Sequence, residues 1–94
     1  MTKADIINRV SENTGIEKVT VQKAVEAFME TVKESLTGGR NVYLRGFGSF
    51  IVKKRAEKVA RNISRNTIVI VPKHFIPSFK PSETFVEQVK EQVK

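Results

Sequence analysis

Apolar residues recur at two different spacings along the chain, and the change of spacing separates helical segments from extended ones. Thr2 followed by Asp5 matches a helix N-cap with an acid at the third helical position. Gly15 can adopt the left-handed backbone conformation in which many helices end. The residues between them that follow helical spacing are Ile6, Ile7, Val10 and Thr14. This pattern predicts a short first helix between Thr2 and Gly15.

A longer helix is predicted to begin between Glu17 and Thr20 and to end at Gly38 and Gly39. Its apolar stripe consists of Val21, Val25, Phe28, Met29, Val32 and Leu36. The opposite face is polar, which is typical of a core-facing helix with one solvated side. We therefore interpret this helix as structural.

Beyond the second helix the spacing changes to two, the period of a half-buried strand. Val42 and Leu44 alternate with more polar neighbours. Gly46-Phe47-Gly48 interrupts the alternation, which resumes with Phe50 and Val52. The pattern predicts a β-hairpin.

A long second hairpin follows the first. Residues 49–60 can continue as one strand, residues 62–66 are polar apart from Ile63 and predict a tip, and the β-branched residues 67–71 return to Pro72. The apolar content falls away along the outgoing strand, so this hairpin has too little apolar surface to pack alone. We expect it to project as an arm.

The last predicted element is a helix over residues 82–94, capped by Ser82 after Pro81, with an apolar stripe of Val86, Val89 and Val93 beside Phe85. The fold class is therefore α+β: two N-terminal helices, a three-stranded antiparallel sheet with a long projecting β-arm, and a C-terminal helix. We expect one domain over residues 1–94, with a helical part at 1–39, a sheet and arm at 40–81, and the arm at about 53–72.

A chain of 94 residues is short for a stable core of its own. Domains of this size bury only about 60% of their unfolded surface, and a projecting arm removes residues from the core. A second copy would help to bury four aromatic side chains, Phe28, Phe47, Phe50 and Phe79. We therefore expect the helical part to support dimerisation.

Positive charge is concentrated in the predicted arm. The chain has 17 Lys and Arg against 10 Asp and Glu, for a net charge of +7. Residues 53–66 hold one acid, Glu57, and six bases: Lys53, Lys54, Arg55, Lys58, Arg61 and Arg65. A patch of one sign favours a nucleic-acid partner over the alternative of a solvated charged loop. Because no aromatic residue lies within the patch to stack on bases, duplex binding is favoured over single-strand binding.

Residues that support catalysis or cofactor binding are scarce. The chain has no cysteine, and His74 is its only histidine, so a thiolate or zinc site is not expected. The glycines at 46 and 48 complete neither a dinucleotide fingerprint nor a Walker loop. The longest aliphatic run, residues 68–71, is too short to span a membrane. We expect a soluble, unexported binding protein with no enzymatic activity, cofactor, metal or small-molecule substrate.

The hairpin residues also match a known pattern, and the match extends over essentially the whole chain. The matching residues of the sheet and arm are Gly46-Phe47-Gly48-Ser49-Phe50, Arg55, Lys58, Arg61-Asn62, Pro72, Pro77 and Phe79; those of the helices are Gly15, Ala24, Ala27, Phe28 and Gly39. In these features the chain resembles the HU and integration host factor family. Its members are bacterial architectural proteins that bind duplex DNA as intertwined dimers, insert two β-arms into the minor groove and bend the helix.

The resemblance implies roles for individual residues. Arg55, Lys58 and Arg61 would face the backbone and groove, with Asn62 at the tip, while Phe47, Phe50 and Phe79 would belong to the dimer core. Lys3 and Lys80 would contact phosphates on the flanks. The complete set of expected DNA-binding residues is Lys3, Arg45, Lys53, Lys54, Arg55, Lys58, Arg61, Asn62, Ile63, Ser64, Arg65, Asn66, Lys73 and Lys80.

Several residues depart from the family pattern. Ile63 stands where most members place a wedging proline, so it is either a wedge or one exposed apolar residue in a turn. Asn66 stands where glycine is usual, and it tolerates the left-handed conformation. Ile68 and Ile70 replace charged residues and either pack within the arms or leave a bare edge. Glu83 and Val86 replace lysines, which predicts a shorter flank contact.

The expected function is therefore largely sequence-tolerant binding, bending and compaction of double-stranded DNA by a cytoplasmic, nucleoid-associated homodimer, or by a heterodimer with a paralogous subunit. Two alternatives stay open. The first is a sequence-preferring subunit similar to integration host factor, in which a costly kink selects deformable DNA. The second is a protein-assembly module whose basic arm binds an acidic partner.

Overall fold

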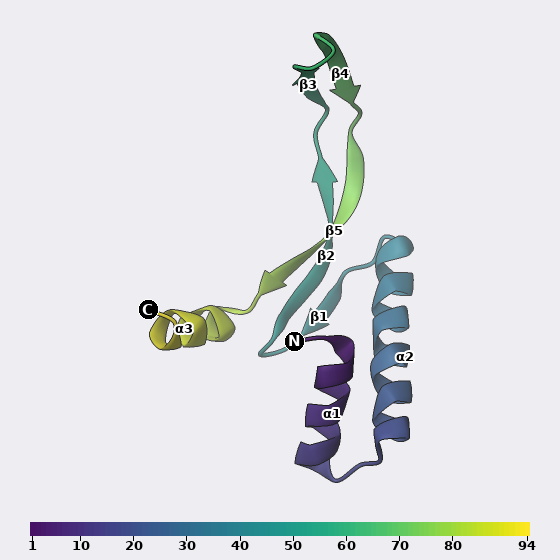
Figure 1. The fold of residues 1–94 in the computed structure, drawn as a ribbon, viewed down its shortest axis with the longest axis vertical. Helices are drawn as coiled ribbons and strands as arrows, with labels where there is room; N and C mark the ends of the chain where they lie inside the picture. The colour runs from purple at the N-terminus through teal and green to yellow at the C-terminus, as the bar shows by residue number, and fades with distance from the viewer. The chain divides into compact units, whose positions relative to one another are not determined.

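A computed structural model describes all residues from 1 to 94 and divides the chain into two compact units, Met1–Ser35 and Leu36–Lys94 (Figure 1). The helices are α1 (Lys3–Thr14), α2 (Lys18–Thr37) and α3 (Glu83–Gln92). The strands are β1 (Val42–Leu44), β2 (Gly48–Arg55), β3 (Lys58–Asn62), β4 (Thr67–Val71) and β5 (His74–Pro81). The α+β class and the order of its elements are confirmed. None of the helices has the length and apolar content needed to cross a membrane.

Helix α1 begins and ends where its capping residues predict. The Thr2 hydroxyl accepts a hydrogen bond from the Asp5 N–H at 3.3 Å, and the Asp5 carboxylate accepts one from the Thr2 N–H at 2.9 Å. The hydrogen bond from the Thr2 backbone, and then one from the Thr2 side chain, lower the pKa of the Asp5 carboxyl. Gly15 adopts a left-handed conformation with φ +74° and donates its N–H to the Ser11 carbonyl. Local sequence therefore determines both ends of this helix.

Helix α2 starts within the predicted window and ends before Gly39, whose φ is +80°. Val21 and Val32 of its apolar stripe are buried. Phe28 and Met29, from the same stripe, remain 46% and 39% exposed in the single chain. The stripe is therefore only partly covered within one protomer.

Strands β1, β2 and β5 form the expected three-stranded antiparallel sheet, in the order β1-β2-β5. Phe50 is paired with Val42 on one side and Phe79 on the other, and Arg55 is paired with His74 at the far end. The sequence patterns did not delimit β5, because Pro77 interrupts its β-branched and aromatic residues.

The arm is a separate two-stranded sheet, β3 and β4, that continues the hairpin beyond β2 and β5 (Figure 1). The prediction of one unbroken strand over residues 49–60 is wrong, because Ala56 and Glu57 lie outside both strands. The returning chain explains the break: Pro72, between β4 and β5, has no N–H to donate to the ladder. The tip predicted at residues 62–66 is a turn at residues 63–66, whereas Asn62 is the last residue of β3 and pairs with Thr67.

Aromatic side chains hold the sheet and α3 together. Phe79 lies with its ring centroid 5.1 Å from that of Phe47 and 5.0 Å from that of Phe50, and Phe47 stacks on Phe85 of α3 at 5.7 Å. Gly48 permits this packing, because a Cβ atom there would lie 2.6 Å from the Lys80 carbonyl oxygen and 2.7 Å from Cζ of Phe79. Ser82 caps α3 by accepting a hydrogen bond from the Phe85 N–H at 3.3 Å, as predicted.

Candidate nucleic-acid interface

The three-stranded sheet has two chemically different faces. Side chains alternate along each strand, and directly paired residues of an antiparallel ladder share a face. The register therefore puts one set of side chains, apolar except for Lys54, on what we call the apolar face: Val42, Leu44, Phe50, Val52, Lys54, Phe75, Pro77, Phe79 and Pro81. The other set forms what we call the basic face: Tyr43, Ser49, Ile51, Lys53, Arg55, His74, Ile76, Ser78 and Lys80.

The register separates two lysines that are neighbours in sequence. Lys53 is paired with Ile76 and shares the basic face with Arg55 and Lys80. Lys54 is paired with Phe75 and belongs to the apolar face. A partner bound on the basic face can thus contact Lys53 and Arg55 together, while Lys54 points to the other side of the sheet.

A shallow groove of about 440 Å³ lies at the end of the sheet away from the arm. Arg45, in the turn between β1 and β2, lines this groove together with Lys80 of β5. Ser49 and Ser82 add hydroxyl groups to its lining, and Glu83 adds a carboxylate. Two of the expected DNA-binding residues are therefore brought together, and the Glu83 carboxylate reduces the positive potential beside them.

Within the arm, the basic side chains point to both faces. Lys58 is paired with Val71, whereas Arg61 is paired with Ile68 on the opposite face of the two-stranded sheet. Ile68 and Ile70 are 72% and 60% exposed, so no other part of the chain covers them. The arm thus presents cations flanked by exposed aliphatic side chains.

The tip of the arm is a closed turn held by its own side chains. Arg61 donates a hydrogen bond from Nη2 to Oδ1 of Asn66 at 2.7 Å, and Ser64 donates to Oδ1 of Asn62 at 2.8 Å. Asn66 has φ +51°, so it takes the left-handed conformation expected where glycine is usual. Ile63 is 88% exposed at this tip.

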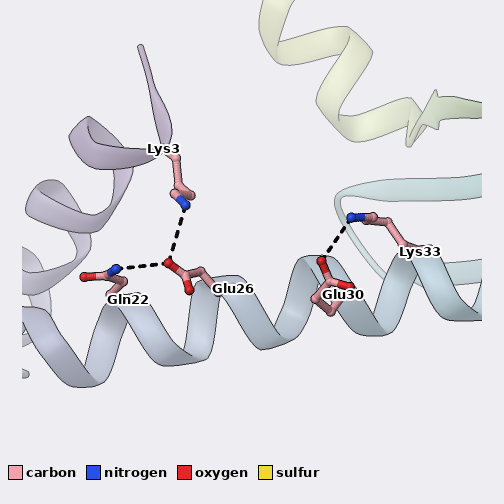
Figure 2. Close-up of polar contacts among 5 residues, drawn as sticks. All are labelled: Lys3, Gln22, Glu26, Glu30 and Lys33. Atoms are coloured by element: carbon pink, nitrogen blue, oxygen red, sulfur yellow. Dashed lines mark hydrogen bonds and ion pairs between the residues drawn. The ribbon is translucent and has the colours of Figure 1, made fainter.

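Lys3 lies in the unit Met1–Ser35, and its ammonium group already forms an ion pair within that unit. Its ammonium nitrogen is 3.4 Å from Oε1 of Glu26, which also accepts a hydrogen bond from Gln22 at 3.0 Å (Figure 2). The hydrogen bond from Gln22, and then that from Lys3, lower the pKa of Glu26. A phosphate that binds Lys3 must therefore compete with a carboxylate. Figure 2 also shows the second ion pair of α2, in which Lys33 lies 3.0 Å from Glu30.

Sequence reasoning missed the polar neighbours of the basic cluster. Ser49, Ser78 and His74 share the basic face with Lys53, Arg55 and Lys80, although none of the three was expected to bind DNA. The alternation of residues on β2 could have indicated Ser49. His74 and Ser78 could not have been found, because they depend on the β2–β5 register. Of the expected residues outside the strands, Lys73 is exposed between β4 and β5, and Arg65 is exposed in the tip.

Comparison with known proteins places these features in a family context. Residues 1–90 match the model of the family described as bacterial DNA-binding protein. The DNA-binding protein HU of Geobacillus stearothermophilus is 37% identical over 90 residues, which cover 96% of this chain and 100% of the relative. Integration host factor subunit beta of Marinobacter nauticus is 35% identical over 95 aligned positions, which cover 100% of this chain and 97% of the relative. A cocrystal structure of Anabaena HU with DNA superposes with a TM-score of 0.89 at 30% identity, covering 95% of this chain and 97% of that chain.

Proposed function

This chain belongs to the bacterial DNA-binding protein family, together with HU and integration host factor, and we propose that it is an architectural protein that binds and bends duplex DNA with little sequence preference. One observation carries the proposal: the basic face of the sheet continues into an arm whose residues 53–66 hold six bases and one acid. This surface is long and cationic, and residues 53–66 contain no aromatic side chain on which unpaired bases could stack, which favours a duplex over a single strand.

Binding would begin with the phosphates. In our proposal, Lys53, Arg55 and Lys80 on the basic face hold the backbone, with Arg45 beside Lys80 at the groove. Each neutralised phosphate releases condensed counterions, so the logarithm of the association constant falls by about 0.9 per contact for each log unit of salt. These contacts fix the position of the duplex and carry no sequence information, which supports sequence tolerance.

The arm would then follow the minor groove. Lys58 and Arg61 face opposite sides of the two-stranded sheet, so a narrow groove can offer a phosphate or a base edge to each of them. Asn62, Ser64, Arg65 and Asn66 make up the polar tip around Ile63. Insertion of Ile63 between base pairs would cost a few kcal/mol of stacking, offset by the protein surface that bent DNA can contact.

Two copies would assemble through the uncovered apolar surfaces. Phe28, Phe47 and Phe79 are 46%, 46% and 38% exposed in the single chain, more than phenyl side chains in a stable core. A second protomer would cover them and supply a second arm, so that one assembly grips the duplex at two places. In this proposal residues 1–39 and helix α3 serve dimerisation, and residues 40–81 bind DNA.

The rival functions are less well supported. The relatives reported above are named for DNA binding or for integration host factor, which favours a DNA-binding arm over a protein-assembly arm. The chain is about as similar to HU as to the integration host factor subunit. The comparisons therefore do not favour a sequence-preferring heterodimer over a homodimer. We expect binding rather than catalysis, in the cytoplasm and at the nucleoid.

Fluorescence anisotropy with a random-sequence duplex and the matching single strand, each titrated across salt, tests the proposal. We expect tight duplex binding that weakens steeply with salt, and weak binding of the single strand. Negligible duplex binding at low salt would overturn the proposed function and favour the assembly module.

A further inference from the structure

His74 lies within the basic face, although it belongs to no expected site. It is the first residue of β5, exposed, and paired directly with Arg55 of β2. Lys53 lies on the same face, two pairs further along the ladder. Any phosphate held by Arg55 therefore comes within reach of the imidazole.

The ring is oriented by one hydrogen bond. Its Nδ1 atom lies 2.9 Å from the carbonyl oxygen of Pro72. A carbonyl oxygen can only accept, so Nδ1 must carry the hydrogen and donate it. The nitrogen that gains or loses a proton is then Nε2, which has no partner within the chain. Neutral Nε2 presents a lone pair that a phosphate oxygen repels, whereas protonated Nε2 presents a donor.

The charges around the ring differ between the free and the DNA-bound protein. Arg55 faces it from β2, Lys53 lies diagonally on the same face, and Lys73 precedes it in the chain. Glu57, in the connection from β2 to β3, is the only acid among residues 46–82, and Lys54 points to the opposite face. These cations attract the phosphates of a duplex, and a phosphate held beside the ring favours its protonated form.

We propose that His74 is a phosphate contact that forms when its imidazole is protonated, so that each protomer takes up a proton, at most one, as it binds duplex DNA. This inference rests on the proposed function of the basic face. Histidine is suited to this role, because its charge changes between about pH 5 and 8. The protein would consequently bind DNA more tightly in mildly acidic conditions.

The test uses the full-length parent and two variants, His74→Gln and His74→Lys, with circular dichroism as a check that each is folded. Anisotropy titrations with a random-sequence duplex are run at about pH 5.5 and 7.5 and at several salt concentrations. We expect the parent to bind more tightly at the lower pH, by about tenfold for each protomer that makes the contact, the effect of one charge-assisted hydrogen bond. Its log-salt slope should also be steeper there by about 0.9 for each protomer that makes the contact.

The variants separate the histidine from other effects of pH. His74→Gln should bind at about pH 7.5 as the parent does and gain little on acidification, while His74→Lys should bind tightly at both values. A parent whose gain on acidification equals that of His74→Gln overturns the inference, although duplex binding by both would leave the proposed function intact. If neither the parent nor the variants bind duplex at either pH, the proposed function has failed and the inference falls with it.

Discussion

The division of the sheet into two faces makes a sharp prediction about neighbouring lysines. Lys53 and Lys54 are the same residue type, adjacent in β2 and both exposed. Lys53 shares the basic face with Arg55, whereas Lys54 lies opposite Phe75 on the apolar face. Lys53→Ala and Lys54→Ala therefore remove identical charges that differ mainly in direction, and each serves as the control for the other.

The expected difference follows from counterion release. If Lys53 makes one phosphate contact in each protomer, Lys53→Ala lowers the log-salt slope by about 0.9 per contact, or about 1.8 for a dimer. Lys54→Ala removes only a charge that acts across the sheet, and at about 0.1 M salt such an interaction is screened beyond about 10 Å. We expect the slope for Lys54→Ala to stay close to that of the parent.

Anisotropy titrations of the parent and both variants over a series of salt concentrations measure these slopes directly. Thermal unfolding of each variant confirms that the fold is intact, which is expected because both side chains are exposed. The assignment of DNA to the basic face is refuted if Lys54→Ala reduces the slope as much as Lys53→Ala does.

Four further predictions test other parts of the molecule. Ile63→Asp should reduce the bend of a duplex at equal occupancy, measured by energy transfer between its labelled ends; an unchanged bend would argue against a wedge. Glu83→Lys should steepen the log-salt slope by about 0.9 for each new phosphate contact, and the same titrations would show it. Gly48→Ala should lower the free energy of unfolding by about 1–3 kcal/mol in a denaturant melt, because the new Cβ meets the Lys80 carbonyl. Because the pKa of Glu26 lies below its ordinary value of 4.5, the ionised carboxylate stabilises the fold at pH values above 4.5. This contribution is lost as the pH falls through the lowered pKa. The stability difference between the parent and Glu26→Gln should therefore shrink on acidification, as measured by melts across pH.

Much of the fold could be predicted because its signals are local. The caps at Thr2 and Ser82 and the left-handed glycine at position 15 depend on residues within one helical turn, and each lies where the pattern indicated. The tip at residues 63–66 was likewise marked by its composition. The concentration of positive charge in residues 53–66 is a property of composition that no tertiary arrangement removes.

The arrangement of the candidate site depended on tertiary structure. In a strand each residue faces the side opposite to its neighbours, so a shift of one residue in the β2–β5 register would exchange the faces of β5 relative to β2. That register joins His74 to Arg55, Lys80 to Ser49 and Phe75 to Lys54. The break at Ala56 and the ion pair of Lys3 with Glu26 likewise depend on residues distant in sequence. The sequence by itself determined that the chain carries a cationic arm, and only strand pairing decided which cations share a face.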